Sequence, residues 1–268
     1  MSSDQNLYIA VKWNMVRLPE DAGVEAMFRT ALDTGFDGIT LTAPGAYDLT
    51  EVLRAQDKTG IPIHNINVAE HWQIRLTDPD PAVREAALQN TIGAIEFAHA
   101  VGASSVLQVI GKVTDPETEN LAQVGQRSAE QLTKALPTAA RLGVQIACEN
   151  VANGHGTSIA EWIAYLDQFQ SPWVGAFFDI GNHDRFDGGA PAWIRALGSR
   201  IVKIDVKDHD HSAEKNCDLF QGNVDWPGVR QALTEIGYTG WATAEVRGGD
   251  AAALKVVSRD MRKALGIA

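Results

Sequence analysis

Short apolar runs alternate with longer stretches of helical period along the whole chain. The runs span about five to seven residues, a length that suits strands buried on both faces of a parallel sheet. This alternation, with no shift in composition between units, predicts a single-domain (β/α)8 TIM barrel, an α/β fold, over residues 1–268. A Rossmann-like sheet is the alternative, but no G-x-G-x-x-G motif follows a run. The expected strands are 7–13, 37–42, 61–67, 104–110, 144–149, 174–179, 201–206 and 241–246.

The stretch from 80 to 101 gives the clearest helical signal, because apolar residues recur there at three- and four-residue steps. Asp80 and Pro81 suit the first turn of this helix, and Gly102 is placed to end it. The same stop signal precedes other expected strands, at Gly35, Gly60, Gly143, Gly198 and Gly237.

Composition narrows the classes of partner. The formal net charge of −11 gives a surface that repels phosphate backbones and anionic lipid heads, so we expect no nucleic-acid partner. No apolar window approaches the ~20 residues that span a bilayer, so we expect no membrane partner. The amino terminus lacks a secretory pattern, and Cys148 and Cys217 are too few for a disulfide framework. These features predict a cytoplasmic protein and leave homo-oligomerisation open.

Four successive expected strands carry an acidic residue at or near their carboxyl ends, where barrel enzymes place their active sites. A single such residue is more often a helix cap or a loop hydrogen bonder, but four in succession are harder to explain in that way. Because side chains alternate along a strand, the acids face the barrel mouth if their apolar neighbours face the helices. The four residues are Glu149, Asp179, Asp205 and Glu245.

Four carboxylates at one point repel each other unless a cation lies between them. Oxygen ligands favour hard or borderline ions, so we expect Mn²⁺ or Mg²⁺. Such an ion could bind two neighbouring oxygens of a sugar and acidify the C–H bond next to a carbonyl. One carboxylate could then remove that proton and another could return it.

Several segments resemble the xylose isomerase-like superfamily of sugar isomerases and epimerases. They are Cys-Glu-Asn at 148–150, Phe-Phe-Asp-Ile-Gly-Asn at 177–182 and Val-Lys-Ile-Asp-Val-Lys-Asp at 202–208. Three further segments lie within 222–246: Gly-Asn-Val-Asp-Trp, Ile-Gly-Tyr-Thr-Gly-Trp and Ala-Glu-Val. The resemblance implies a divalent metal held by Glu149, Asp179, position 205 and Glu245. It also implies that Glu149 and Glu245 act as the catalytic acid–base pair.

Position 205 departs from the family, which usually has histidine there in a His-x-Lys-Asp pattern. Asp205 adds a negative charge that would favour a hard dication, or it means that the metal has been abandoned. Lys203 and Lys207 share the parity of Asp205, so either ammonium group could neutralise part of the cluster. His209 and His211 could supply the missing imidazole.

Five residues are candidates for binding substrate. His155 and His183 lie near positions where relatives contact sugar hydroxyls, and Asn182 is the polar residue three after Asp179. Lys207 and Arg247 follow the seventh and eighth expected strands and could bind anionic or hydroxyl groups.

We therefore expect a metal-assisted isomerase or epimerase that acts on a small carbohydrate by removing a proton next to a carbonyl. A lyase or dehydratase on a keto-sugar or keto-inositol would use the same site. A non-catalytic barrel, acting as a subunit or binding module, is the third alternative, and Asp205 keeps it open. A multi-zinc nuclease is disfavoured by the acidic balance and by the absence of histidine at 205. No phosphate loop is present, which favours a sugar without phosphate.

Overall fold

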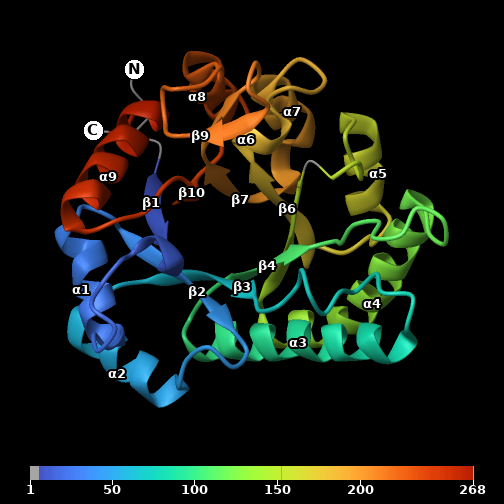
Figure 1. The fold of residues 1–268 in the computed structure, drawn as a ribbon, viewed down its shortest axis with the longest axis horizontal. Helices are drawn as coiled ribbons and strands as arrows, with labels where there is room; N and C mark the ends of the chain where they lie inside the picture. Colours follow the sequence, from blue (N-terminus) through green and yellow to red (C-terminus); the bar gives the residue numbers. More distant parts are fainter. Residues whose placement is uncertain (1–5, 152, 268) are drawn as a thin grey trace.

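Eight parallel strands close into a barrel in the computed structural model, which describes residues 6–151 and 153–267 (Figure 1). The amino-terminal residues, for which the sequence predicts no secretory signal, lie mostly outside the described residues. The order around the barrel is β1-β10-β7-β6-β5-β4-β3-β2, so the TIM-barrel prediction is confirmed. The strands are β1 (Leu7–Lys12), β2 (Gly38–Ala43), β3 (Ile63–Val68), β4 (Ser105–Val109), β5 (Gln145–Glu149), β6 (Val174–Asp179), β7 (Ile201–Val206) and β10 (Gly240–Ala244).

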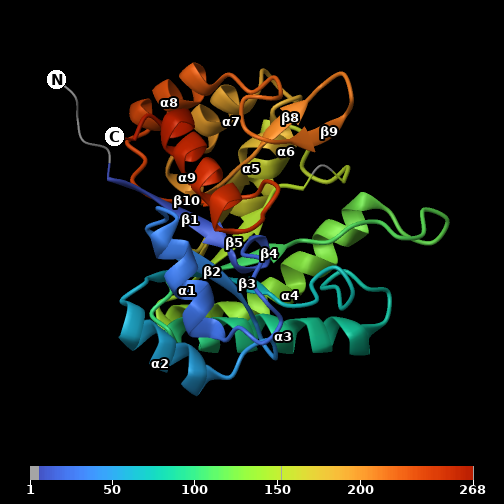
Figure 2. The ribbon, with the colours of Figure 1, turned by 60° about the vertical axis from the view of Figure 1, so that its left-hand side comes forward.

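Helices surround the barrel on its outside (Figures 1 and 2). They are α1 (Val24–Asp33), α2 (Leu49–Thr59), α3 (Pro81–Ala100), α4 (Leu121–Leu142), α5 (Ile159–Asp167), α6 (Ile180–His183), α7 (Ala190–Leu197), α8 (Trp226–Glu235) and α9 (Ala251–Leu265). Two 3-10 turns, Trp13–Met15 and Gly198–Arg200, complete the helical segments of the described chain. Within the described ranges, none of the helices has both the length and the apolar character that a bilayer crossing requires.

The ends of α3 follow from local chemistry, and its observed bounds lie within one residue of the expected 80–101. Asp80 is the N-cap and accepts a hydrogen bond from the backbone of Ala82, while Pro81 occupies the first turn. Gly102 follows the helix with φ of 77°, a left-handed conformation that glycine adopts without strain.

A short antiparallel hairpin interrupts the barrel pattern after β7. Its strands are β8 (Asp208–Asp210) and β9 (Lys215–Cys217), and the sequence pattern did not predict them. The buried carboxylate of Asp208 holds this insertion, because it accepts hydrogen bonds from the backbone of Phe220 and Val224 and from the Trp226 indole.

Apolar residues form two separate clusters, one between barrel and helices and one inside the barrel. Ile146 and Cys148 of β5 belong to the outer cluster, whereas Ala147 belongs to the inner one with Phe177 of β6. Alternation along each strand therefore continues the inner series to Glu149, two residues after Ala147. The same parity brings an acidic side chain from each of the neighbouring strand ends to the carboxyl face of the barrel.

Candidate metal and catalytic site

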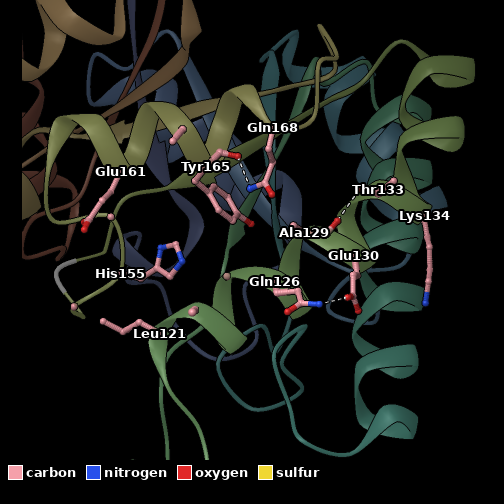
Figure 3. Close-up of a pocket in the computed structure, with 15 residues that line it drawn as sticks. Leu121, Gln126, Ala129, Glu130, Thr133, Lys134, His155, Glu161, Tyr165 and Gln168 are labelled. Atoms are coloured by element: carbon pink, nitrogen blue, oxygen red, sulfur yellow. Dashed lines mark hydrogen bonds between the residues drawn. The ribbon is translucent and has the colours of Figure 1, made fainter.

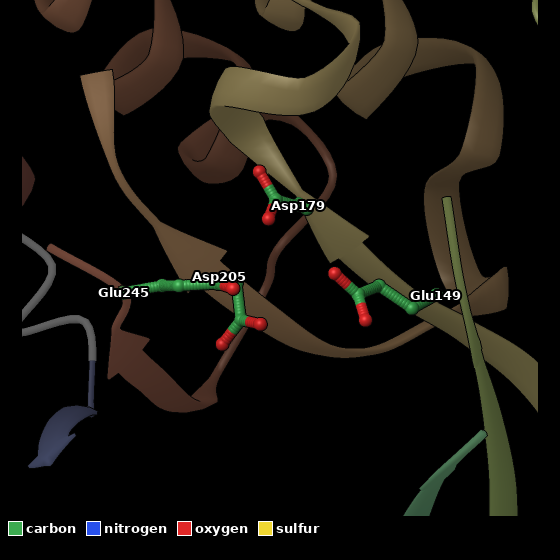
Figure 4. Close-up of side chains that lie close together, drawn as sticks. All are labelled: Glu149, Asp179, Asp205 and Glu245. Carbon is green, nitrogen blue, oxygen red and sulfur yellow. The ribbon is translucent and has the colours of Figure 1, made fainter. Parts of the chain in front are cut away.

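Four carboxylates meet at the carboxyl end of the barrel (Figure 4). One oxygen from each lies within 4.8 Å of the corresponding oxygen of every other. Three of the residues are buried, and the side chain of the fourth, Glu245, is 33% exposed. The structure thus brings together the predicted set Glu149, Asp179, Asp205 and Glu245.

The strand register explains this convergence. Asp179 of β6 pairs with Asp205 of β7, and Glu149 of β5 pairs with Phe177, two residues before Asp179 and on the same face of β6. Glu245 follows the last residue of β10, and its backbone N–H donates to the carbonyl of Val206. Residues far apart in the chain are therefore neighbours around one rim.

Two lysines enter the carboxylate cluster. The ammonium of Lys12 lies 2.7 Å from Asp205 Oδ2 and 3.0 Å from Glu245 Oε2. The ammonium of Lys207 lies 2.6 Å from Asp179 Oδ2 and 3.3 Å from Glu245 Oε2. Both ammonium groups therefore contact the same oxygen of Glu245, Oε2.

Burial and neighbouring charges shift the protonation of these groups. Burial, reinforced by the negative charge of Glu245, raises the pKa of Glu149 to about 7. Burial also raises the pKa of Asp205, although Lys12 opposes this. For Glu245, Lys12 and Lys207 overcome the effect of burial and hold the pKa well below its ordinary value. Burial alone would lower the pKa of Lys12, but Asp205, Glu245 and Glu149 together raise it, so Lys12 stays charged.

The donor set fits a divalent ion. When all four acids are ionised, as binding to a metal requires, four carboxylates and two ammonium groups leave two negative charges, which one dication would neutralise. Asp205 Oδ1 is buried and has no hydrogen-bond donor among the described residues. A set of carboxylate oxygens suits a hard cation. The cluster can therefore hold a metal ion as well as the two lysines.

A cavity of about 340 Å³ opens beside the cluster. Besides the two glutamates and two lysines, it is lined by Asn67, His71, Trp72 and Asn182. Burial and the charge of Lys12 lower the pKa of His71 to about 4, so this imidazole is neutral near neutral pH. The lining thus offers neutral hydrogen-bonding groups and an indole surface, which suit a sugar with hydroxyl groups.

Two of the five predicted substrate residues lie at this cavity. Asn182 lines it, donating to the carbonyl of Asn150 and, at 3.5 Å, to Glu149 Oε1. Lys207 also lines it but is paired with Asp179 and Glu245. Lys207 therefore neutralises the carboxylate cluster in addition to facing the cavity.

The structure does not bring the other three predicted substrate residues to the cavity. His183 is fully buried, and its two ring nitrogens contact Asn150 and the carbonyl of Gly156. Burial lowers the pKa of His183 to about 4, so the imidazole stays neutral and joins the end of α6 to the segment between β5 and α5. Arg247 lines a different cavity, of about 240 Å³, beside α9.

His155 lies in a surface groove between α4 and α5 (Figure 3). The ring stacks edge-on against Tyr165, whose hydroxyl shares a hydrogen bond with Ser128. This groove has a volume of about 1020 Å³, against about 340 Å³ for the cavity beside the carboxylates, but none of the four clustered carboxylates lines it. Volume alone therefore does not mark the chemical site.

Neither candidate for the missing imidazole reaches the carboxylates. His209 Nδ1 contacts Asn216 across the hairpin, and His211 Nε2 lies 2.8 Å from Asp184 Oδ2. Lys203, the other lysine of matching parity, lies deeper in the barrel and donates to Ser104 Oγ. The structure therefore places His209, His211 and Lys203 away from the cluster, and of the two lysines of matching parity it is Lys207 that reaches the carboxylates.

Among the site residues that sequence reasoning missed are Lys12, Asn67 and Asn150. Lys12 ends the first apolar run, so the strand-end rule that selected the acids could also have selected this lysine. Asn150 directly follows Glu149, but nothing in its local pattern indicates that its side chain would bond to the backbone of β6.

Comparison with known proteins gives consistent matches. A family model described as xylose isomerase-like TIM barrel matches residues 28–264. The L-ribulose-5-phosphate 3-epimerase UlaE of Escherichia coli O1:K1 / APEC is 30% identical over 215 residues, which cover 77% of this chain and 73% of that protein. A solved L-ribulose 3-epimerase superposes with a TM-score of 0.82 at 18% identity, covering 97% of this chain and 95% of the other. The IOLI protein with a binding zinc atom superposes with a TM-score of 0.80 at 15% identity, covering 97% and 98%.

Proposed function

The chain belongs to the xylose isomerase-like TIM barrel family, and we propose that it is a metal-assisted epimerase that inverts the carbon next to the carbonyl of a ketose. One observation carries this proposal: four carboxylates and two lysines converge beside a sugar-sized cavity at the carboxyl end of the barrel. The free thiols of Cys148 and Cys217 support a reducing, cytoplasmic setting.

Epimerisation requires one group that takes a proton and another that returns it to the opposite face of the substrate. Glu245 takes the proton, because Lys12 and Lys207 hold it as a carboxylate. Glu149 reaches the same cavity from β5, three strands away from β10 around the barrel. With a pKa raised to about 7 by burial, Glu149 can exchange a proton near neutral pH.

The metal would be Mn²⁺ or Mg²⁺, held by Glu149, Asp179, Asp205 and Glu245. When bound, such an ion supplies Lewis acidity that polarises the substrate carbonyl and lowers the pKa of the adjacent C–H. Asn182 and Asn67 line the cavity and orient the sugar hydroxyls by hydrogen bonds.

The preferred substrate is a ketose without phosphate. Lys12 and Lys207 are the only basic Lys or Arg side chains lining this cavity within the described chain, and both are already paired with carboxylates. A phosphate dianion would add charge beside Glu149 and Glu245 without a free cation to receive it. This preference differs from the phosphorylated substrate in the name of the E. coli relative.

The test is exchange of substrate hydrogen with solvent. Purified protein with MnCl2 is incubated in D2O with L-ribulose and, separately, with L-ribulose 5-phosphate, and NMR follows deuterium at C3 and appearance of the epimer. We expect exchange with a higher kcat/KM for the free ketose. Glu149→Gln and Glu245→Gln should each lower the exchange rate by about 10²–10⁴-fold. Glu130→Gln, in the distant α4–α5 groove, is the matched control and should keep the rate.

Absence of deuterium incorporation from a panel of five- and six-carbon ketoses, in protein that retains bound metal, would refute the epimerase proposal. An unsaturated ketone among the products would indicate the lyase reaction instead.

A further inference from the structure

Lys12 joins the carboxylate cluster from a strand that carries none of the four acids. The register pairs Val11 with Ala244 on one side of β10, and Asp205 with Thr243 on the other. Lys12, the next residue after Val11, is therefore level with Glu245 and reaches across β10 to Asp205 on β7. Lys12 is 7% exposed and Asp205 is fully buried, so solvent screens their interaction little.

We propose that Lys12 is a charge-compensating residue for the divalent ion: its ammonium group cancels the extra negative charge that Asp205 brings to the ligand set. The inference rests on the proposed function for the presence of the ion. The Lys12–Asp205 pair is neutral as a unit, so the site keeps a net charge of two negatives that a single dication balances.

The geometry argues that Lys12 accompanies the ion and does not replace it. Lys12 contacts Oδ2 of Asp205, while Oδ1 stays buried without a donor among the described residues. Neither ammonium group lies within 4.0 Å of Glu149 in the described part of the chain. Acceptor oxygens on opposite sides of the cluster therefore remain for a central cation.

Variants that change the charge at positions 12 and 205 test whether Lys12 sets the affinity of the site for Mn²⁺. Lys12→Met makes the site one charge more negative, so we expect Mn²⁺ to bind about tenfold more tightly or better. Asp205→Asn removes a ligand charge and leaves Lys12 opposing the ion, so affinity should fall by about tenfold or more. The double variant restores the original charge, and its dissociation constant should return to within about threefold of the parent value.

The dissociation constant for MnCl2 is measured without substrate, by the electron paramagnetic resonance signal of free Mn²⁺ in titrations of the metal-depleted full-length chain. Lys12→Arg keeps the charge and should stay near the parent, which guards against a Lys12→Met protein that folds poorly. Lys203→Met is the matched control, because Lys203 is also a buried lysine but bonds to Ser104. Its Mn²⁺ affinity should be unchanged.

Three outcomes would overturn the proposal. Equal affinity in parent and Lys12→Met would mean that the lysine only fills space. Weaker binding in Lys12→Met, whether or not Lys12→Arg binds like the parent, would mean that the contacts of this side chain and not its charge govern the affinity. Binding in Lys12→Met but none in the parent would mean that Lys12 has replaced the ion. The titration measures Mn²⁺ binding and not turnover, so its result can be interpreted even if the protein shows no epimerase activity.

Discussion

The side chain of Asn150 exchanges two hydrogen bonds with the backbone of Asp179: Nδ2 donates to the carbonyl at 2.9 Å, and Oδ1 accepts from the N–H at 2.7 Å. Asn150 is fully buried and directly follows Glu149, so this clamp joins the ends of β5 and β6. The relative position of two cluster carboxylates thus depends on a neutral amide.

Replacing Asn150 with alanine should disturb both the fold and the site. The variant leaves buried backbone groups of Asp179 unpaired, so we expect the free energy of unfolding to fall by about 2–4 kcal/mol. Mn²⁺ affinity should also fall, because Asp179 is no longer fixed beside Glu149. Urea denaturation and a metal titration check this, with Asn90→Ala on α3 as control. A parent-like metal affinity would show that the clamp does not position Asp179.

Lys207→Met should destabilise the protein strongly in the absence of metal. The variant removes the ammonium group that contacts Asp179 and Glu245. Because a buried carboxylate then lacks its partner, we expect the free energy of unfolding to fall by about 3–5 kcal/mol. Saturating MnCl2 should recover part of this loss, since an ion that binds only the folded state stabilises it. Thermal melts with and without MnCl2 measure the effect. The exposed Lys134→Met is the control, and an equal loss in both variants would contradict the assignment.

Asp208→Asn should loosen the β8–β9 insertion. Each carboxylate oxygen of Asp208 accepts two hydrogen bonds, among them one from the Trp226 indole to Oδ2 and one from the Val224 backbone to Oδ1. The amide nitrogen of asparagine would face two N–H donors in place of an acceptor oxygen. We therefore expect the free energy of unfolding to fall by about 2–4 kcal/mol and the environment of Trp226 to change. Asp210→Asn in the same hairpin should cost less than about 1 kcal/mol, because Asp210 is only partly buried and its bonds from Ser212 and Ala213 all reach Oδ1, so the amide nitrogen can take the place of Oδ2. Denaturation followed by tryptophan fluorescence distinguishes the two.

His183 should make the protein sensitive to acid. Its folded pKa of about 4 lies below the ordinary 6.5, so the unfolded chain binds the proton first as the pH falls. Above pH 6.5 the imidazole is neutral in both states and costs the fold nothing. As the pH falls from 6.5 to 4, protonation of the unfolded chain lowers the free energy of unfolding, by about 3 kcal/mol in all. The stability gap between parent and His183→Gln should therefore shrink over this range, as measured by urea denaturation at several pH values. A stability gap that stays constant from pH 7 to pH 4 would contradict this prediction.

The eight strands, the bounds of α3 and the acids at four strand ends could be predicted because each depends on local information. Apolar period, capping residues and alternation act over a few residues, and the closed barrel repeats one local unit. Parity alone also directs Glu149 and Asp179 to the inner face once Cys148 and Phe178 face the helices.

Only the tertiary structure decided which groups serve these acids. Lys12 meets Asp205 across 193 positions of sequence because barrel closure pairs β1 with β10 and fixes the register on both sides of β10. His155, by contrast, follows Glu149 closely in the chain yet lines an outer groove between α4 and α5. Local pattern determines which face a side chain occupies, whereas register and loop path, set by packing over the whole chain, determine what it meets there.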